Sequence, residues 1–370
     1  MKMDRSCNAP RFFWKVLILF LSLPTHQALS SKSTRALNNT VSAFIVFGDS
    51  TVDPGNNNNL RTVFKSDFLP YGRDFANQVP TGRFTNGRLA TDYIASYIGI
   101  KDYVPAYLEP SLSFEDLKTG VSFASAGSGY DPLTPKLSNV VSLPKQLEYF
   151  KEYKKRLVST LGKQSTTHHI NKAVFIVSAG TNDFVVNYFT LPIRRQSFTI
   201  ASYQQFLLQH VKDLIKGLWE EGARRIAIVG LPPMGCLPIM ITLNSNNAVQ
   251  QRGCMDQFSS VARDYNALLQ TELASMQSSL ANQGSRIYYA DIYKPISDMV
   301  QKFPSYGFDE ALSGCCGTGL LEAAFLCNPN SYVCPDASRY VFWDSIHPTE
   351  KAYNLIFQLL RPVVDAVIRD

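Results

Sequence analysis

The chain reads AFIVFGDS over residues 43–50. Its apolar start, rich in aromatic and β-branched side chains, predicts a buried β-strand. Small residues follow at Gly48-Asp49-Ser50 and predict a turn, so the strand presents a serine hydroxyl at its carboxyl end. Ser50 is therefore the first candidate for a reactive side chain.

Similar apolar runs recur at residues 121–124, 173–177, 225–229 and 286–290, with helical patterns between them. Residues 203–219, for example, repeat apolar side chains at three- and four-residue spacing, and Gly222 offers a stop. This alternation predicts a parallel sheet with helices on both faces. The expected fold class is α/β, a three-layer α/β/α sandwich with a central parallel sheet.

Turn residues follow the predicted strands at Ser50, Gly127, residues 180–182 and Pro232-Pro233. In open parallel sheets the ligand crevice lies beyond the carboxyl ends of the strands. We therefore expect these residues, although distant in sequence, to meet at one edge of the sheet.

A second signal, DSIHP, occupies residues 344–348. We expect the last helix to begin after Pro348, with Thr349 and Glu350 at its start, and to hold this loop against the core. Its predicted buried side carries Tyr353, Ile356, Phe357 and Leu360.

A serine hydroxyl is a poor nucleophile near neutral pH, so it needs a base and a carboxylate that orients the base. Ser50, His347 and Asp344 supply one of each. His347 also fits a residue at the start of a helix or, with Asp344, half of a metal site, but no second histidine is near in sequence. The chain contains no Gly-x-Ser-x-Gly pentapeptide, which argues against the α/β-hydrolase fold.

Four sequence blocks occur in order at residues 47–50 (with Asp53), 123–127, 180–183 and 344–348, and two more at 70–72 and 81–88. Together they closely resemble the GDSL family of SGNH hydrolases, and most of all its plant esterase/lipase branch. The resemblance covers nearly all of the chain after residue 30 and implies a flavodoxin-like SGNH hydrolase fold.

The resemblance assigns the catalytic serine to Ser50, the histidine to His347 and the orienting acid to Asp344. It implies an oxyanion hole formed by the Ser50 N–H, a glycine of the second block and the Asn182 side-chain amide. Gly127 is preferred to Gly129 for the glycine, although spacing alone does not choose. Asn182 taken alone is better explained as a turn cap, since Gly-Thr-Asn-Asp is good turn sequence.

Asp53 and Asp183 stand beside the catalytic blocks and are expected to hydrogen-bond the loops that hold Ser50 and Asn182, with turn capping as the rival role. Among the other histidines, His168 and His169 are expected on the surface in a polar loop. His210 falls on an apolar helical stripe and is expected in the core.

Residues 1–30 combine basic side chains, an apolar core and small residues, which predicts a secretory signal peptide cleaved near Ser30; a membrane anchor is the alternative. Its removal lowers the formal charge from +6 to +3. The basic residues are scattered, which argues against nucleic acid, and no linker or repeat divides residues 31–370. We expect a single secreted, extracellular domain without a stable membrane anchor.

Six cysteines follow the signal segment, an even number that favours disulfides in an oxidising compartment. Cys236 is expected to pair with Cys254, and two bridges are expected among Cys315, Cys316, Cys327 and Cys334, whose connectivity stays open. Their spacing does not fit a zinc site. Asn38 lies in an Asn-x-Thr sequon and is a candidate glycosylation site.

The predicted function is a secreted serine esterase or lipase that acts on acyl esters through an acyl-enzyme on Ser50, with no cofactor and no metal. The same site could transfer the acyl group to a sugar or lipid hydroxyl, and a silent binding protein for lipid or cell-wall polymer is a rival of another class. The resemblance implies ester substrates from short acyl esters through lipids to acetylated polysaccharide. Loop aromatics either line an acyl groove or pack the loops, and they are Phe64, Phe68, Tyr71, Tyr188 and Phe189.

Overall fold

The computed structural model describes residues 41–247 and 251–369. The predicted signal peptide at residues 1–30 and the candidate glycosylation site at Asn38 lie outside the described residues.

The central sheet has four parallel strands in the order β1-β2-β3-β4. Their bounds are Phe44–Gly48 for β1, Val174–Ser178 for β2, Arg225–Val229 for β3 and Arg286–Ala290 for β4. Each falls within one residue of a predicted strand, because strands buried on both faces appear as unbroken apolar runs. The predicted α/β class with a central parallel sheet is confirmed.

The prediction of a strand at residues 121–124 is wrong. This segment lies beside β1 and joins it only through an isolated bridge between Val46 and Ser122. Val46 exchanges backbone bonds with Val121 and Phe123 on this side, and Ser122 exchanges them with Pro105 and Tyr107 on the other. Single bridges therefore replace a regular ladder.

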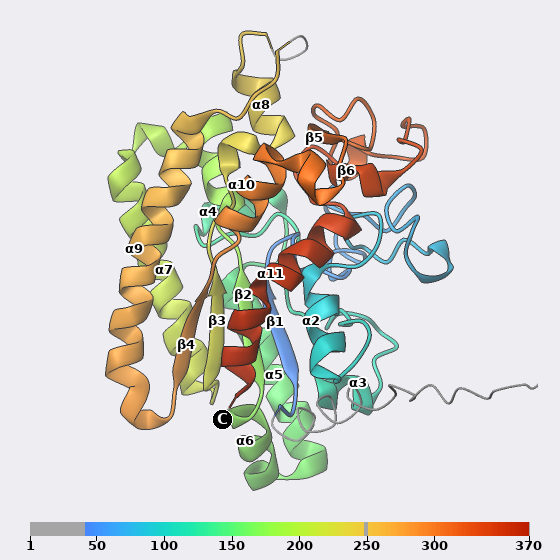
Figure 1. Cartoon of the computed structure of the whole chain (residues 1–370). Helices are drawn as coiled ribbons and strands as arrows, with labels where there is room; N and C mark the ends of the chain where they lie inside the picture. Colours follow the sequence, from blue (N-terminus) through green and yellow to red (C-terminus); the bar gives the residue numbers. More distant parts are fainter. Residues whose placement is uncertain (1–40, 248–250, 370) are drawn as a thin grey trace, which may run out of the picture.

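Helices cover both faces of the sheet (Figure 1): α2 and α11 pack on one face, and α5, α7 and α9 on the other. The predicted last helix is α11, which begins after Thr349, and this threonine caps its first turn. Shorter helices and one π-helix, η2, occupy the connections. The helices are α2 (Ala90–Ile98), α3 (Phe114–Thr119), α4 (Leu133–Ser138), α5 (Leu143–Leu161), α6 (Lys163–Asn171), η2 (Asp183–Thr190), α7 (Ile200–Glu220), α8 (Pro238–Asn244), α9 (Asp256–Leu280), α10 (Tyr293–Gln301) and α11 (Glu350–Ile368).

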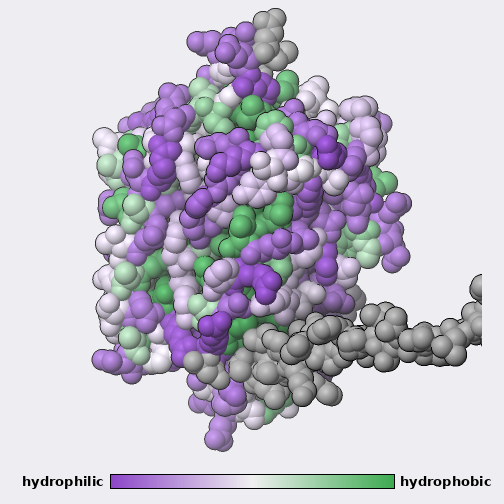
Figure 2. Space-filling view, in the orientation of Figure 1, coloured by the Kyte–Doolittle hydropathy of each residue, from purple (hydrophilic) through white to green (hydrophobic). Residues whose placement is uncertain are grey.

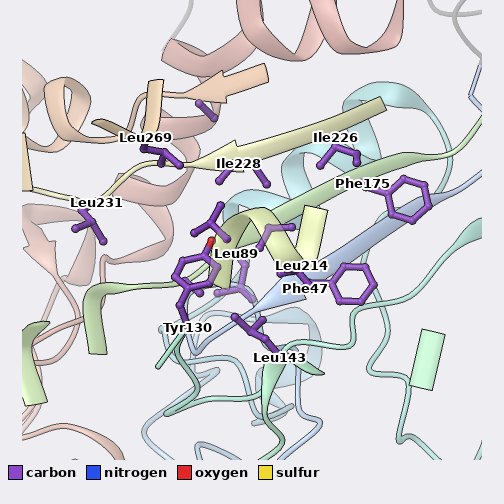
Figure 3. Close-up of a cluster of buried hydrophobic side chains, with 14 of the residues drawn as sticks. Phe47, Leu89, Tyr130, Leu143, Phe175, Leu214, Ile226, Ile228, Leu231 and Leu269 are labelled. Carbon is purple, nitrogen blue, oxygen red and sulfur yellow. The ribbon is translucent and has the colours of Figure 1, made fainter. Parts of the chain in front are cut away.

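The larger core cluster joins the sheet to α5, α7 and α9 (Figure 3). On the sheet it contains Phe47, Phe175 and Ile228, and on the helices Leu214 and Leu269. Alternate strand residues such as Val46 and Ile176 point to the opposite face and pack against α2 and α11. The carboxyl ends of all four strands are thus held rigidly at the edge where the site lies.

A small parallel sheet, β5 (Glu310–Gly314) with β6 (Tyr340–Phe342), lies beside the central sheet's carboxyl edge (Figure 1). Disulfides cross-link this region. Cys236 pairs with Cys254 as expected, and the four later cysteines, whose connectivity the sequence left open, pair as Cys315–Cys334 and Cys316–Cys327.

Two expectations for histidines are corrected. His168 and His169 lie in helix α6 rather than in a loop; His168 is exposed, and His169 is half-buried with its Nε2 atom 2.9 Å from the Lys118 carbonyl oxygen. His210 is half-buried rather than core, because it lies at the rim of the α7 stripe against the ring of Phe206. Within residues 41–247 and 251–369, no helix is long and apolar enough to cross a membrane.

Candidate active site

The three predicted catalytic side chains form one hydrogen-bonded row. The Nε2 atom of His347 is 2.7 Å from the Ser50 hydroxyl oxygen, and its Nδ1 atom is 2.8 Å from Oδ2 of Asp344. The exposed fractions are 7% for Ser50, 4% for His347 and 0% for Asp344. With Nδ1–H assigned as the donor to the carboxylate, Nε2 is free to accept the serine proton.

The backbone around Asp344 fixes its carboxylate. Oδ1 accepts hydrogen bonds from the backbone N–H groups of Ile346 at 2.8 Å and His347 at 2.7 Å. The Asp-x-x-His spacing therefore serves two purposes, since it folds the loop into a tight turn and brings the imidazole back onto the same carboxylate. The carboxylate and the imidazole cannot rotate independently.

The turn that presents Ser50 requires glycine at position 48. Gly48 has a φ of +144°, and a Cβ atom built on it would lie 1.9 Å from the carbonyl oxygen of Ser178 on β2. Gln146 of α5 braces the same residue, because its side-chain amide accepts from the Gly48 N–H and donates to the Gly48 carbonyl, both at 2.9 Å. Sequence analysis did not single out Gln146, which follows no recognisable motif.

Asp49 is buried beside the nucleophile, and its Oδ1 accepts from the N–H and the hydroxyl of Thr51. Burial raises the pKa of Asp49 to about 6 against the opposing effect of the Thr51 hydrogen bonds. The Thr51 hydroxyl in turn lies 3.0 Å from that of Ser178. These contacts tie the turn at Ser50 to the end of β2.

The second and third sequence blocks meet beside this turn. The Ser125 N–H donates to the Gly48 carbonyl at 3.0 Å, and the Asn182 amide donates to the Ser128 carbonyl at 2.9 Å. One N–H of the Asn182 amide is used in this way, which leaves its second N–H for a ligand.

The two candidate glycines of the second block differ. Gly127 is buried with a φ of +83°. Within the described residues the N–H groups of Gly127, Gly129 and Ser50 make no hydrogen bond. Gly129 packs directly against the Asp183 carboxylate, where a Cβ atom would lie 2.1 Å from Oδ1.

Asp53 hydrogen-bonds the loop that follows Ser50, whereas Asp183 makes its hydrogen bonds to residues 130–134 and not to the loop of Asn182. Asp53 accepts from the backbone N–H groups of Gly55, Asn56 and Ala126 at 2.7–2.9 Å, so it caps its own turn and also joins it to the second block. Burial raises its pKa to about 6.

Asp183 accepts from the N–H groups of Tyr130 at 2.8 Å and Asp131 at 3.2 Å and from the Thr134 hydroxyl. Burial raises its pKa to about 7. Asp183, the residue after Asn182, is therefore hydrogen-bonded to the segment that follows Gly129 and fixes its position.

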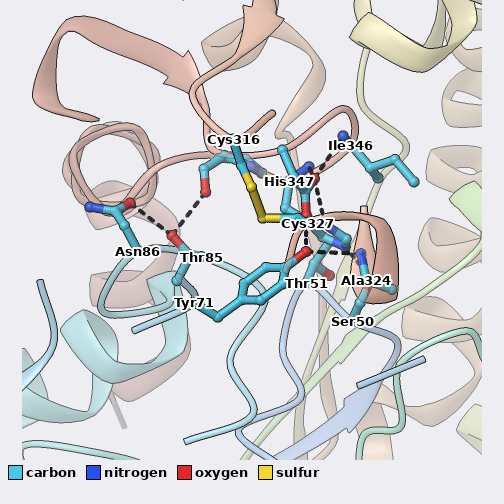
Figure 4. A network of polar contacts seen from close by, with 12 residues as sticks. Ser50, Thr51, Tyr71, Thr85, Asn86, Cys316, Ala324, Cys327, Ile346 and His347 are labelled. Carbon is cyan, nitrogen blue, oxygen red and sulfur yellow. Dashed lines mark hydrogen bonds and ion pairs between the residues drawn. A yellow bond between two sulfur atoms is a disulfide. The ribbon is translucent and has the colours of Figure 1, made fainter. Parts of the chain in front are cut away.

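Tyr71 is the site residue that sequence analysis missed. It was expected to line a groove or pack a loop, but it is fully buried, and its hydroxyl donates to Oδ2 of Asp344 at 2.8 Å while accepting from the Ala324 N–H at 2.9 Å (Figure 4). Burial and the neighbouring carboxylate raise the pKa of Tyr71 well above its usual range. Tyr71 stands in the sequence block at residues 70–72, but the block does not reveal this role, because its partners lie more than 250 residues away.

The block at residues 81–88 supports the histidine loop. The centroids of the Phe84 and His347 rings are 4.9 Å apart. The Thr85 hydroxyl donates to the Pro348 carbonyl at 3.0 Å (Figure 4). Asn86 accepts from the Glu350 N–H at 2.8 Å, at the first turn of α11.

Of the other predicted loop aromatics, Phe64 and Phe68 pack against the cluster around Tyr71, whereas Tyr188 and Phe189 lie in η2 and pack against α7 and α9. Phe68 packs edge-on against Tyr71, Tyr188 stacks on Tyr203, and Phe189 packs against Phe258. Within the described part of the chain, no group of three or more His, Cys, Asp or Glu side chains is placed to hold a metal ion.

A sequence profile of the GDSL-like lipase/acylhydrolase family matches residues 44–360. The chain belongs to this family. It is 60% identical to the GDSL esterase/lipase At5g45960 of Arabidopsis thaliana over 91% of this chain and 90% of that protein. It is also 43% identical to the GDSL esterase/lipase At1g06990 of the same plant, over 92% and 95% of the two chains, and 42% identical to the GDSL esterase/lipase EXL3, over 96% of each.

The resemblance inferred from the motifs is thereby confirmed. As a GDSL esterase/lipase, the protein is a carboxylic ester hydrolase.

Proposed function

We propose that the protein hydrolyses acyl esters through a covalent acyl-enzyme on Ser50. The Ser50 oxygen attacks the ester carbonyl while His347 Nε2 takes the hydroxyl proton, and Asp344 stabilises the imidazolium that forms. The imidazolium then returns this proton to the leaving alcohol as the carbon–oxygen bond of the ester breaks. Water, deprotonated by His347, releases the acid and restores Ser50.

The proposed oxyanion hole consists of the N–H groups of Ser50 and Gly127 and the amide of Asn182. In favour of Gly127 is its backbone φ of +83°, which glycine tolerates, together with an N–H that makes no hydrogen bond within the described residues, whereas Gly129 packs against the Asp183 carboxylate. Preorganised donors of this kind stabilise the charge that develops on the carbonyl oxygen, and loss of one costs about 3 kcal/mol of the barrier.

The observation that carries the proposal is the 2.7 Å contact between His347 Nε2 and the Ser50 hydroxyl, with Asp344 behind the imidazole. Nucleophile, base and orienting acid come from opposite ends of the chain, so their contact is a property of the folded molecule. A binding protein would not need this row of contacts.

Secretion belongs to the same proposal. The six described cysteines all form disulfides, which persist in extracellular and secretory compartments. We propose that residues 1–30 are a signal peptide removed near Ser30 and that Asn38 carries a glycan. Mass spectrometry of the secreted protein, before and after enzymatic deglycosylation, tests both points: an N-terminus before residue 25 or an unmodified Asn38 contradicts them.

Hydrolysis of p-nitrophenyl esters of several chain lengths by the wild type and by Ser50→Ala tests the mechanism. Loss of at least a thousandfold in kcat is expected for Ser50→Ala. Ser159→Ala, at an exposed serine of α5, serves as the matched control and retains full activity. Equal activity of wild type and Ser50→Ala refutes the role of Ser50.

Acyl transfer is the alternative use of the same intermediate. Addition of an acceptor alcohol such as glycerol distinguishes the two activities, because a hydrolase forms mainly free acid and a transferase mainly glyceryl ester. Absence of turnover on every ester, with and without acceptor, favours the silent binding protein.

A further inference from the structure

Four consecutive asparagines, at residues 56–59, follow the turn that carries Ser50. Hydrophilic residues cover much of the molecular surface seen in Figure 2, yet two of these side chains are buried, with exposed fractions of 2% for Asn56 and 1% for Asn57. Asn59 is exposed. A buried amide is costly unless its polar atoms are hydrogen-bonded, so the partners of the two buried side chains show what each of them holds in place.

The Asn57 amide donates to two backbone carbonyls, that of Ala126 at 2.9 Å and that of Phe64 at 2.8 Å. Because a carbonyl only accepts, these contacts assign the nitrogen of the amide to this side. The Oδ1 atom accepts from the Ser125 hydroxyl at 2.5 Å, and the Ser125 oxygen accepts from the Val141 N–H at 3.1 Å. The Asn57 side chain therefore cannot rotate without breaking buried hydrogen bonds.

The Ala126 carbonyl belongs to the same peptide group as the Gly127 N–H, a proposed oxyanion donor. This peptide bond is trans and planar, so its C=O and its N–H point in opposite directions. The hydrogen bond from Asn57 therefore fixes the direction of the Gly127 N–H. It also polarises the peptide group, which makes the N–H a stronger donor.

The same loop fixes the other side of Ala126. The Ala126 N–H donates to Oδ2 of Asp53 at 2.9 Å. Asp53 and Asn57 both follow Ser50 in one loop, so this loop presents the nucleophile and also holds the peptide that carries a proposed oxyanion donor. The nucleophile and this donor are thereby held relative to each other by short-range contacts.

Asn56 has a comparable set of contacts but holds a different part of the neighbouring segment. Its amide donates to the carbonyls of Ser122 and Ala124, both at 2.8 Å, and its Oδ1 accepts from the Leu108 N–H at 2.9 Å. None of these groups belongs to the peptide that carries the Gly127 N–H. Asn56 is therefore a matched buried amide that separates a role in catalysis from a role in stability.

We propose that Asn57 is a positioning residue for the oxyanion hole, an inference that rests on the proposed function. It acts on the reacting ester through the peptide group that joins Ala126 to Gly127. When negative charge develops on the carbonyl oxygen of the ester, the Gly127 N–H needs no reorientation to donate to it. The effect of Asn57 therefore belongs to the transition state and not to substrate binding.

Asn57→Leu removes the donating amide and keeps a side chain of similar size. With p-nitrophenyl butyrate, kcat is expected to fall at least about tenfold, short of the roughly hundredfold or more that loss of a whole oxyanion donor costs. KM should change by less than about twofold, because a contact made only in the transition state leaves substrate binding unaffected.

Asn56→Leu is the matched control at a buried amide. It should lower the melting temperature about as much as Asn57→Leu but retain a kcat within about twofold of the wild type. Asn59→Ala, at the exposed residue, should change neither. Equal kcat values for Asn57→Leu and Asn56→Leu overturn the proposal, because both would then act only through stability.

Ser125→Ala decides the question where Asn57→Leu does not fold. It removes the hydroxyl that holds Asn57 Oδ1 and leaves the amide donors in place. In this variant kcat is expected to fall about threefold or more, and a wild-type kcat then overturns the proposal.

Inhibition by butylboronic acid tests the transition-state role directly. The Ser50 oxygen adds to boron as its proton passes to His347, and the tetrahedral boronate anion resembles the charged intermediate. The inhibition constant should rise in Asn57→Leu by about the factor by which kcat falls, and it should stay at the wild-type value in Asn56→Leu. Wild-type inhibition of Asn57→Leu overturns the proposal.

Ser50→Ala separates this inference from the proposed function. Equal activity of wild type and Ser50→Ala, or none in either, refutes the mechanism, and the inference falls with it. Ser50-dependent turnover with a wild-type kcat and a wild-type inhibition constant in Asn57→Leu refutes the inference and leaves the mechanism standing.

Discussion

At the scale of single residues, the Asp344 carboxylate is the most constrained group of the site. It accepts hydrogen bonds from the His347 ring, from two backbone N–H groups of its own loop and from the Tyr71 hydroxyl. A carboxylate that is fixed by several hydrogen bonds is preorganised to orient the imidazole. Tyr71 is therefore a positioning residue, acting on the serine through Asp344 and His347.

Tyr71→Phe removes this hydroxyl and leaves Asp344 Oδ2 and the Ala324 N–H without that partner. We expect kcat to fall roughly tenfold, the equivalent of one hydrogen bond to a charged group, with little change in KM. Because the remaining negative charge on Asp344 is shared with fewer donors, the acidic limb of the pH–kcat profile should move to higher pH.

Steady-state kinetics across pH check this prediction, with Tyr332→Phe as the control at a tyrosine that is 70% exposed. An unchanged kcat and pH profile in Tyr71→Phe would show that the hydroxyl does not position the carboxylate.

Asp49 makes stability depend on pH. Burial raises its pKa from 3.8 to about 6 in the folded protein, so the folded state binds the proton more tightly than the unfolded state. Its contribution to the free energy of unfolding is therefore greatest below about pH 4 and declines as the pH rises through 6. Asp49→Asn should be stabilised relative to wild type by up to about 3 kcal/mol at pH 8 but not at pH 4.

Urea unfolding at both pH values measures this difference, and Asp264→Asn on the exposed side of α9 is the control. A difference between Asp49→Asn and wild type that is the same at pH 4 and pH 8 contradicts the assignment.

At the scale of elements, the close approach of β1 and β2 depends on Gly48. Any side chain there would collide with the Ser178 carbonyl, which is backbone and cannot move aside. Gly48→Ala should therefore destabilise the protein by about 3 kcal/mol or more and reduce activity, because the Ser50 turn moves. Gly253→Ala, where a Cβ atom meets nothing within 4 Å, is the control. Thermal unfolding of both variants gives the comparison, and equal melting temperatures would be incompatible with this account.

The disulfide loops act on the site through Tyr71. Cys316–Cys327 closes the loop that contains Ala324, and Ala324 donates to the Tyr71 hydroxyl. Replacing both cysteines by serine should cost about 3 kcal/mol of stability for a loop of this size. It should also lower kcat, because Ala324 positions Tyr71, and Tyr71 positions Asp344 and His347.

A double-mutant cycle separates this effect from general loosening. The effects of Tyr71→Phe and of Cys316→Ser/Cys327→Ser on kcat should be less than additive, since both weaken one contact. Additive effects would show that the disulfide and Tyr71 act independently.

At the scale of the whole molecule, the features that the sequence predicts correctly are those with a signal in a short stretch of neighbouring residues. The strands β3 and β4 were predicted at their observed bounds, because each appears as a short run rich in apolar and β-branched or aromatic side chains. Segment 121–124 has the same appearance but meets each neighbour at a single bridge, with Val46 on one side and Ala106 on the other. Periodicity does not reveal where backbone bonds go, so that prediction was wrong.

The catalytic residues follow the same logic. Ser50, Asp344 and His347 stand in short motifs with a chemical meaning, and the structure brings the three into contact. Tyr71 and Gln146 act through contacts with distant segments, so their roles are not visible locally, although Tyr71 stands in the block at residues 70–72. The single-domain organisation of residues 31–370 stays a prediction.

The most direct test of the central claim is to trap the acyl group. Rapid acid quenching during turnover of p-nitrophenyl butyrate, followed by proteolysis and mass spectrometry, identifies the acylated residue. The account predicts one butyryl group on the peptide that contains Ser50, and none in Ser50→Ala. Turnover at the wild-type rate with no acyl group on Ser50, or with the group on another residue, would contradict it.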